Sequence, residues 1–175
     1  MARQYFGTDG IRGRVNTPPM TAESALRLAI AAARTFAPNG GREVVIGRDT
    51  RRSGQMIEAA LIAGLTSMGL KPVLLGIVPT PTVALMTRET GAALGLMVSA
   101  SHNKSDDNGI KLFSPAGIKL TDAEEEALEA AMASAFEGDF APPPAISTPH
   151  HMKGATTLYL ERCLETVGTD IDFSG

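Results

Sequence analysis

Three short apolar runs set the pattern of this sequence. They occupy residues 43–46, 72–78 and 94–98, and the segments after the first two place apolar residues at helical spacing. A run that is apolar at nearly every position is typical of a strand in a sheet covered on both faces. Strands that alternate with helices indicate βαβ units. The sequence therefore predicts an α/β fold of three layers, with a mixed, mostly parallel sheet between helices.

Capping residues mark where the helices begin and end. Thr21 and Ser53 are expected N-caps, and Gly69 suits the position just after a helix. Thr121 and Glu124 have the spacing of a capping box. The predicted helices are residues 22–36, 54–68, 83–89 and an acidic helix from 122 to about 136.

Two further strands and a turn segment complete the expected first domain. Residues 109–113 and 118–120 are apolar enough for strands that flank a turn at 114–117. Residues 6–14 contain three glycines and mixed charges, which predicts a loop or a short hairpin.

The C-terminal part of the chain is different in composition. Three consecutive prolines at 142–144 indicate a linker, and residues 155–167 have helical spacing. Thirty residues after a proline linker cannot form a core of their own. We expect a domain over 1–140, a linker over 141–154, and the start of a second, truncated domain over 155–175.

Composition excludes several classes of protein. The 175 residues are 43% apolar, with a formal net charge of −3, which provides no electrostatic footprint for nucleic acid or an anionic membrane. No apolar run is long enough to cross a membrane, and residues 1–5 lack the apolar part of a secretory signal. Cys163 is the only cysteine, so an intrachain disulfide is excluded. These observations predict a cytoplasmic protein.

Polar residues with chemical potential follow the third apolar run. Ser99, Ser101 and His102 come directly after that strand. Ligands of open α/β sheets bind at the carboxyl ends of strands, although Ser, Asn and Asp are also ordinary turn residues. Both interpretations, a ligand site and a polar turn, are open on composition alone.

Two other charged segments have simpler explanations. Arg48, Asp49 and Arg51 follow the first strand, and we favour an ion-paired scaffold over a lining of the site. The acidic residues 124–126 complement a helix dipole more simply than they bind a metal. Residues 106–109 lack the ligand spacing and closing glutamate of a calcium loop.

Three motifs in order give the sequence a specific likeness. The motifs are residues 6–13 (FGTDGIRG), residues 47–51 (GRDTR, followed by Ser53 and Gly54), and residues 99–103 (SASHN) with 107–111 (DNGIK). Together they resemble the opening motif, a second loop motif and the phosphoserine loop of the α-D-phosphohexomutases. One position departs from that family, which usually has proline where this chain has Lys104. Proline would stiffen the loop by fixing φ, so the departure concerns the loop's rigidity.

The resemblance implies a role for each candidate residue. Ser101 would be the phosphorylated nucleophile and would bind Mg²⁺ through its phosphate. His102 and Lys111 would orient the phosphate and transfer protons, and Arg12 would face the phosphoserine. Phosphate- or substrate-binding positions would be Thr8, Asp9, Ser99 and Asn103.

The resemblance also implies a reaction. Phosphate would move between the 6- and 1-positions of a hexose through a bisphosphate intermediate, with a hexosamine phosphate as the preferred substrate. A mannose or glucose phosphate is the alternative, as is a non-catalytic phosphate- or partner-binding domain. A serine hydrolase is disfavoured, because Ser101 lacks a nucleophile-elbow motif. The likeness extends only to the first of the family's four domains. We therefore expect most Mg²⁺ ligands to lie elsewhere, no turnover by these residues alone, and self-association into a homo-oligomer.

Overall fold

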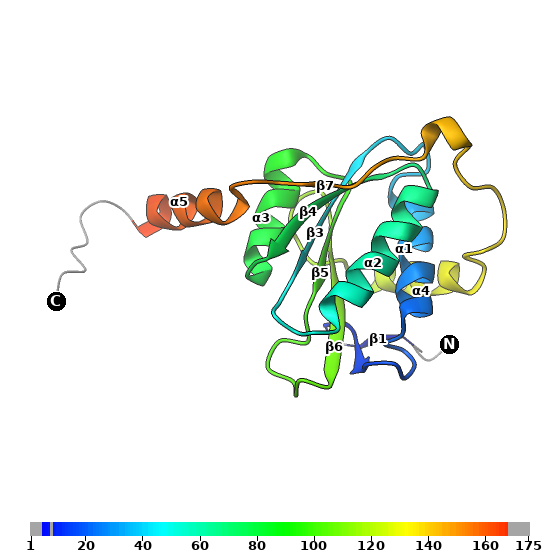
Figure 1. Ribbon diagram of the computed structural model, residues 1–175, viewed down its shortest axis with the longest axis horizontal. Coiled ribbons are helices and arrows are strands. Elements are labelled where there is room, and N and C mark those ends of the chain that lie inside the picture. Colours follow the sequence, from blue (N-terminus) through cyan, green and yellow to red (C-terminus); the bar gives the residue numbers. More distant parts are fainter. Residues whose placement is uncertain (1–4, 8, 168–175) are drawn as a thin grey trace.

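The computed structural model describes residues 5–7 and 9–167, and these form one sheet with helices on both faces (Figure 1). The described strands lie in the order β1-β2-β6-β5-β3-β4-β7. In chain order the elements are β1 (Phe6–Gly7), β2 (Gly10–Arg14), α1 (Ala22–Phe36), β3 (Glu43–Arg48), α2 (Gly54–Ser67), β4 (Lys71–Ile77), α3 (Thr80–Thr90), β5 (Leu94–Val98), β6 (Asp107–Phe113), α4 (Asp122–Ala133), the 3₁₀ turn η1 (Pro143–Ala145), β7 (His150–His151) and α5 (Ala155–Val167).

The sheet is mixed, as the sequence predicted. The strand β3 is parallel to both of its neighbours, β4 and β5, and β7 is parallel to β4. The pairs β5–β6, β6–β2 and β2–β1 are antiparallel, a larger antiparallel share than expected. A short loop joins β5 to β6, and such a loop can only return the chain antiparallel because a parallel neighbour needs a crossover. The polar loop of residues 99–106 therefore lies where strand pairing in the sheet changes from parallel to antiparallel.

Two apolar layers confirm the three-layer prediction. The helices α1, α2 and α4 pack on one face, and α3 packs on the other (Figure 1). The larger core cluster includes Leu28, Ile46, Ile57 and Leu96, each buried against the α1–α2 side. The smaller cluster includes Val83 and Met86 of α3 and the buried strand residues Val45, Val73 and Met97. Apolar side chains on both faces of β3 explain why its sequence does not alternate.

Several local predictions are confirmed at the helix ends. The Thr21 hydroxyl accepts a hydrogen bond from the Ser24 N–H at the start of α1. Thr121 and Glu124 form the reciprocal capping box, and hydrogen bonds from Thr121 lower the pKa of Glu124. Gly69 follows α2 with a φ of +75°.

Other local predictions are wrong. Ser53 is at the N-cap position of α2, as predicted, but its backbone is helical (φ −70°, ψ −13°) and its side chain makes no capping hydrogen bond. Helix α3 begins at Thr80, three residues earlier than predicted, because prolines are well suited to the N-cap and first turn. Helix α4 ends at Ala133 instead of Phe136. The expected strand at 118–120 is reduced to a single bridge between Lys119 and Phe113.

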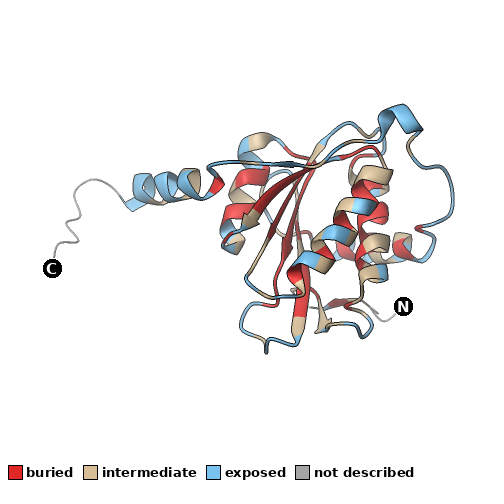
Figure 2. Cartoon of the chain, viewed as in Figure 1, coloured by how far each residue is buried: buried red, intermediate tan, exposed pale blue. Residues whose placement is uncertain are grey.

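The segment after α4 continues the sheet before it leaves the domain. Within the expected linker, His150 and His151 pair with Val73 and Leu74 at the sheet edge. Helix α5 then projects away from the sheet and is mostly exposed (Figure 2). Its Ala155 is buried, whereas Leu160 and Leu164 are exposed. No helix in the described part of the chain has the length and apolar character needed to span a membrane.

Candidate active site

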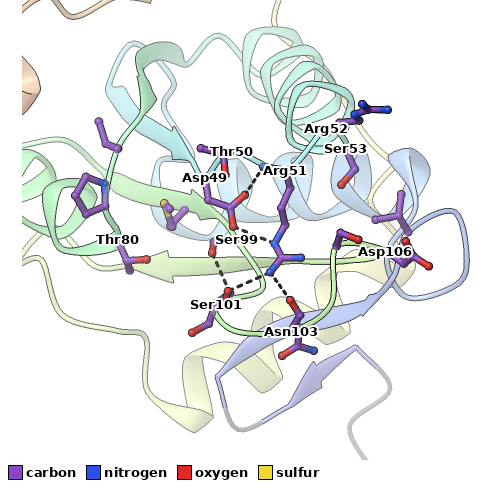
Figure 3. A pocket seen from close by; sticks show the side chains of 15 residues that line it. Asp49, Thr50, Arg51, Arg52, Ser53, Thr80, Ser99, Ser101, Asn103 and Asp106 are labelled. Carbon is purple, nitrogen blue, oxygen red and sulfur yellow. Dashed lines mark hydrogen bonds and ion pairs between the residues drawn. The ribbon is translucent and has the colours of Figure 1, made fainter.

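A hollow of about 910 Å³ opens at the carboxyl ends of β3, β4 and β5 (Figure 3). Residues from three loops line it, including Asp49 and Arg51 after β3, Thr80 after β4, and Ser99 and Ser101 after β5. Because parallel strands end at the same edge of a sheet, loops far apart in sequence meet here. The candidate serine thus lies at the place where α/β sheets bind ligands.

Ser101 has an unusual backbone and an exposed side chain. Its φ is +56°, in the left-handed region that non-glycine residues rarely adopt. Its N–H donates to the Ser99 hydroxyl at 3.0 Å, and Ser99 is itself buried. The Ser101 Oγ lies 3.4 Å from Nδ1 of the exposed His102. The loop therefore presents a hydroxyl and an imidazole side by side to solvent.

Asn103 is used inside the loop. Its side-chain amide donates to Asp107 Oδ2 at 3.0 Å, and its N–H donates to the Ala100 carbonyl at 3.1 Å. Lys104, at the family's usual proline position, is exposed, and its carbonyl accepts from the Asp107 N–H at 3.1 Å. Hydrogen bonds within residues 99–107 thus supply order that proline would otherwise provide.

Arg51 holds this loop from the neighbouring β3 segment (Figure 3). Its Nε donates to Asp49 Oδ2 at 3.0 Å, and Asp49 also accepts from the Arg51 N–H. The two terminal nitrogens donate to four loop carbonyls, those of Ser101, Asn103, Lys104 and Asp107.

Arg48 is also paired, with Glu58 of α2 at 3.1 Å. Both side chains are largely buried, so the pair joins the end of β3 to α2. The ion-paired interpretation of the 47–51 motif is confirmed by these contacts and those of Arg51, although Asp49 and Arg51 also line the hollow.

A second group of charges lies on β2 and β6. Asp9 Oδ2 accepts from Lys111 Nζ at 2.7 Å and is also paired with Arg12 Nη2. The Lys111 hydrogen bond is the main cause that lowers the pKa of Asp9, and the charges of Lys111 and Arg12 add to it against desolvation. Asp9 and Arg12 line a smaller hollow of about 370 Å³. Thr8, the remaining candidate, lies outside the described residues.

Gly109 brings this charged group close to the serine loop. Lys111 pairs directly with Met97, which lines the larger hollow, so the two side chains share a sheet face. A Cβ on Gly109 would lie 2.7 Å from the Ser99 carbonyl and 3.0 Å from Arg12 Cγ. Arg12 therefore crosses β6 over a position where only glycine leaves room. Among the described residues, no hydrogen bond or ion pair joins Ser101 to Arg12 or Lys111.

Two sets of hydrogen bonds near the site were not predicted from the sequence. The buried Asn108 donates to the Ser53 hydroxyl at 2.9 Å and accepts from the Gly109 N–H. Glu129 of α4 accepts from the N–H groups of Tyr5 and Phe6, both at 3.0 Å. An asparagine before glycine indicates a turn, and the half-buried Glu129 of α4 has no local signal that names its partners.

Metal ligands are sparse in this part of the protein. Within residues 5–7 and 9–167 no group of three or more His, Cys, Asp or Glu side chains is placed to hold a metal ion.

Comparison with known sequences identifies relatives over the whole chain. A phosphoglucosamine mutase from Hyphomonas neptunium is 72% identical over 174 residues, which are 99% of this chain and 39% of that protein. One from Caulobacter vibrioides is 50% identical over 175 residues, with the same two shares. The chain thus spans 39% of the length of the curated relatives it matches.

Solved structures share the fold. A putative phosphomannomutase from Thermus thermophilus superimposes with a TM-score of 0.76 at 34% identity, over 95% of this chain and 37% of that one. A phosphoglucomutase/phosphomannomutase family protein from Burkholderia thailandensis gives a TM-score of 0.78 at 25% identity, over 100% of this chain and 37% of that one.

The family likeness read from the three motifs is confirmed by these relatives. Residues 3–139 match the family described as phosphoglucomutase/phosphomannomutase, alpha/beta/alpha domain I. The chain therefore belongs to the phosphoglucomutase/phosphomannomutase family and carries its α/β/α domain I.

Proposed function

We propose that this chain is the first domain of a phosphoglucosamine mutase and that Ser101 carries the phosphoryl group. The observation that supports this most is the loop itself, which presents an exposed serine with φ of +56° at the carboxyl edge of the sheet. The identity of 72% to a protein named phosphoglucosamine mutase supports the choice of sugar.

The proposed reaction has two transfers. The phosphoserine gives its phosphoryl group to the free hydroxyl of glucosamine 6-phosphate, so the Ser101 Oγ–P bond breaks and a sugar O–P bond forms. The bisphosphate sugar then reorients in the site. Its 6-phosphoryl group is transferred to Ser101, which leaves glucosamine 1-phosphate. In each step one hydroxyl loses a proton and another gains one. We propose that His102 exchanges the proton at the Ser101 Oγ, and the 3.4 Å distance between that oxygen and His102 Nδ1 supports this role.

Charge neutralisation falls to the cations on β2 and β6. A phosphoserine has a charge between about −1.5 and −2 near neutral pH. Arg12 can hold two phosphate oxygens with its planar fork, and Lys111 adds a point charge. Asp9 is ion-paired with both side chains until a phosphate arrives. We propose that Ser99 and Asn103 act mainly by shaping the loop. Thr8 and Asp9 remain proposed phosphate- or substrate-binding residues.

Mg²⁺ is the proposed cofactor. This chain offers it the phosphate on Ser101, whose hard oxygen atoms suit Mg²⁺, and the other ligands would come from outside the described residues. When bound, Mg²⁺ neutralises charge on the group in transfer.

The proposed substrate is a hexosamine phosphate. The alternatives are glucose and mannose phosphates, because a solved relative at 34% identity is named a putative phosphomannomutase. We further propose that the protein acts in the cytoplasm and self-associates, with neither nucleic acid nor membrane as a partner.

Phosphate loading tests the assignment. Because most Mg²⁺ ligands are expected outside this domain, the whole protein that contains it is incubated with Mg²⁺ and glucosamine 1,6-bisphosphate, and its intact mass and the peptides of residues 91–120 are then measured. We expect a species heavier by one phosphate group, mapped to Ser101, and none in Ser101→Ala. Glucose and mannose 1,6-bisphosphates, run in parallel, rank the three sugars. Phosphate mapped to any other residue would contradict the assignment.

A further inference from the structure

The Arg51 side chain is fully occupied by hydrogen bonds. A guanidinium has five N–H donors, and all five of these have acceptors here. The Nε donates to Asp49, Nη1 to the carbonyls of Lys104 and Asp107, and Nη2 to those of Ser101 and Asn103. The side chain is only 11% exposed. Arg51 therefore has no donor left for a phosphate, although it lines the hollow.

The contacts of Arg51 fix the direction of the loop peptides. Two of the carbonyls that face Arg51 belong to Ser101 and Asn103. In a trans peptide the C=O and the following N–H point in opposite directions, and the cis bond of the described chain is at Pro18–Pro19. The N–H groups of His102 and Lys104 therefore point away from Arg51. Within the described residues, neither has a hydrogen-bond acceptor.

Only an arginine suits this position. Its rigid fork reaches four carbonyls spread over seven residues, whereas a lysine has three donors on one atom. Asp49 sets the plane of the fork, because it accepts from both Nε and the backbone N–H of Arg51. The requirement is for planar geometry more than for positive charge.

We propose that Arg51 is a positioning residue for phosphoryl transfer at Ser101, an inference that rests on the proposed function. By drawing the loop carbonyls inward, it holds Ser101 in its left-handed conformation and turns the N–H groups of His102 and Lys104 outward. These two outward N–H groups have no acceptor among the described residues and carry partial positive charge, which favours an anion. Arg51 thus prepares the loop for a phosphate that it does not itself contact.

The test compares Arg51→Lys and Arg51→Gln with a matched control, Arg34→Lys. Arg34, in the last turn of α1, also donates to two main-chain carbonyls, those of Ser134 and Asp139. Hydrogen exchange is measured for residues 99–107 and for the core strands β3 and β4. We expect both Arg51 variants to exchange about tenfold faster in the loop only, since hydrogen bonds from a charged donor are lost. The control is expected to leave the loop unchanged.

Loading of Ser101 by the sugar bisphosphate gives a second measurement. For both Arg51 variants, we expect the rate at saturating bisphosphate to fall about a hundredfold, with little change in the half-saturating concentration. If Arg51→Lys keeps both the loop protection and the loading rate, charge is sufficient and the proposal is wrong. Equal acceleration of exchange in the loop and the core would also overturn it, because Arg51 would then stabilise only the fold. A whole wild-type protein that does not load in the presence of Mg²⁺ would count against the proposed function. Faster exchange confined to the loop would still decide whether Arg51 fixes the loop.

Discussion

Two arginines near the serine loop are used in opposite ways. Arg51 gives its five N–H groups to one carboxylate and four neutral carbonyls of its own chain. Arg12 shares a single carboxylate, Asp9, with Lys111, and its buried Nε has no partner among the described residues. All N–H donors of Arg51 are therefore used within the fold, whereas Arg12 has an N–H donor without an acceptor among the described residues. Only a cation with unused donors can add a phosphate without first breaking the structure that holds it.

The charges around the two arginines differ in the same sense. Asp9, Arg12 and Lys111 together have a charge of +1, because two cations share one anion. Asp49 and Arg51 together are neutral. This group on β2 and β6 therefore has surplus positive charge, which would balance the proposed phosphoserine. Asp49 and Arg51 thus fix the loop, whereas Asp9, Arg12 and Lys111 form a group suited to bind the proposed phosphate on Ser101.

Replacing Arg12 should give the largest effect. In Arg12→Gln, we expect loading of Ser101 to fall about 10²–10³-fold, as for removal of one charged donor from a transition state. The free energy of unfolding should change little, because Lys111 still pairs with Asp9. Arg14→Gln is the matched control on the same strand, since that arginine is 74% exposed. Equal loading by the two variants would remove Arg12 from the proposed site.

The sequence predicted the parts of this comparison that depend on neighbours along the chain. The apolar runs indicated β3, β4 and β5, and Thr21, Thr121 and Glu124 indicated helix starts, because those signals lie within a few residues. The motif likeness indicated the family, since three motifs occur in a fixed order. The individual roles of Ser101, His102 and Lys111 remain predictions.

The contacts that distinguish the two arginines could not be predicted. The Arg51 nitrogens reach carbonyls about fifty residues away, and any residue type provides a carbonyl. Ser53 has the local signal of a helix cap, but its hydroxyl accepts a hydrogen bond from Asn108, 55 positions away, and makes no capping bond. Glu129 binds the N–H of Tyr5 from 124 positions away. Such pairings depend on how helices and strands pack, which no short pattern encodes.

Gly109→Ala tests the strand that separates the two groups. The added Cβ would lie 2.7 Å from the Ser99 carbonyl and 2.8 Å from the Ile11 carbonyl, both main-chain atoms that cannot move alone. We expect a loss of about 1–3 kcal/mol in the free energy of unfolding, measured by denaturant titration. Gly7→Ala is the control, because its Cβ would meet nothing closer than 3.7 Å. Equal stability of the two variants would show that β2 and β6 can separate without cost.

The smallest predicted effect concerns the pH dependence of Asp9. Its pKa is lowered by the Lys111 hydrogen bond and by the two nearby cations, so the ionised carboxylate favours the folded state. A lowered folded-state pKa means that this contribution is complete above the unfolded-state value of about 3.9 and is lost as pH falls through the folded-state value. Asp9→Asn should therefore be less stable than wild type near neutral pH, by about 1 kcal/mol at most for a partly exposed pair. The difference should shrink below the ordinary pKa of 3.8.

The same substitution distinguishes two roles for the carboxylate. If Asp9 only occupies Arg12 and Lys111 until a phosphate arrives, Asp9→Asn should load Ser101 at least as fast as wild type, since the competing anion is gone. We expect this result, because the three side chains hold surplus positive charge and a phosphate can take the place of Asp9 on either cation. Slower loading at unchanged stability would instead show that Asp9 aims the two cations at the phosphate. Arg12 and Lys111 would then need a fixed partner as much as Ser101 needs Arg51.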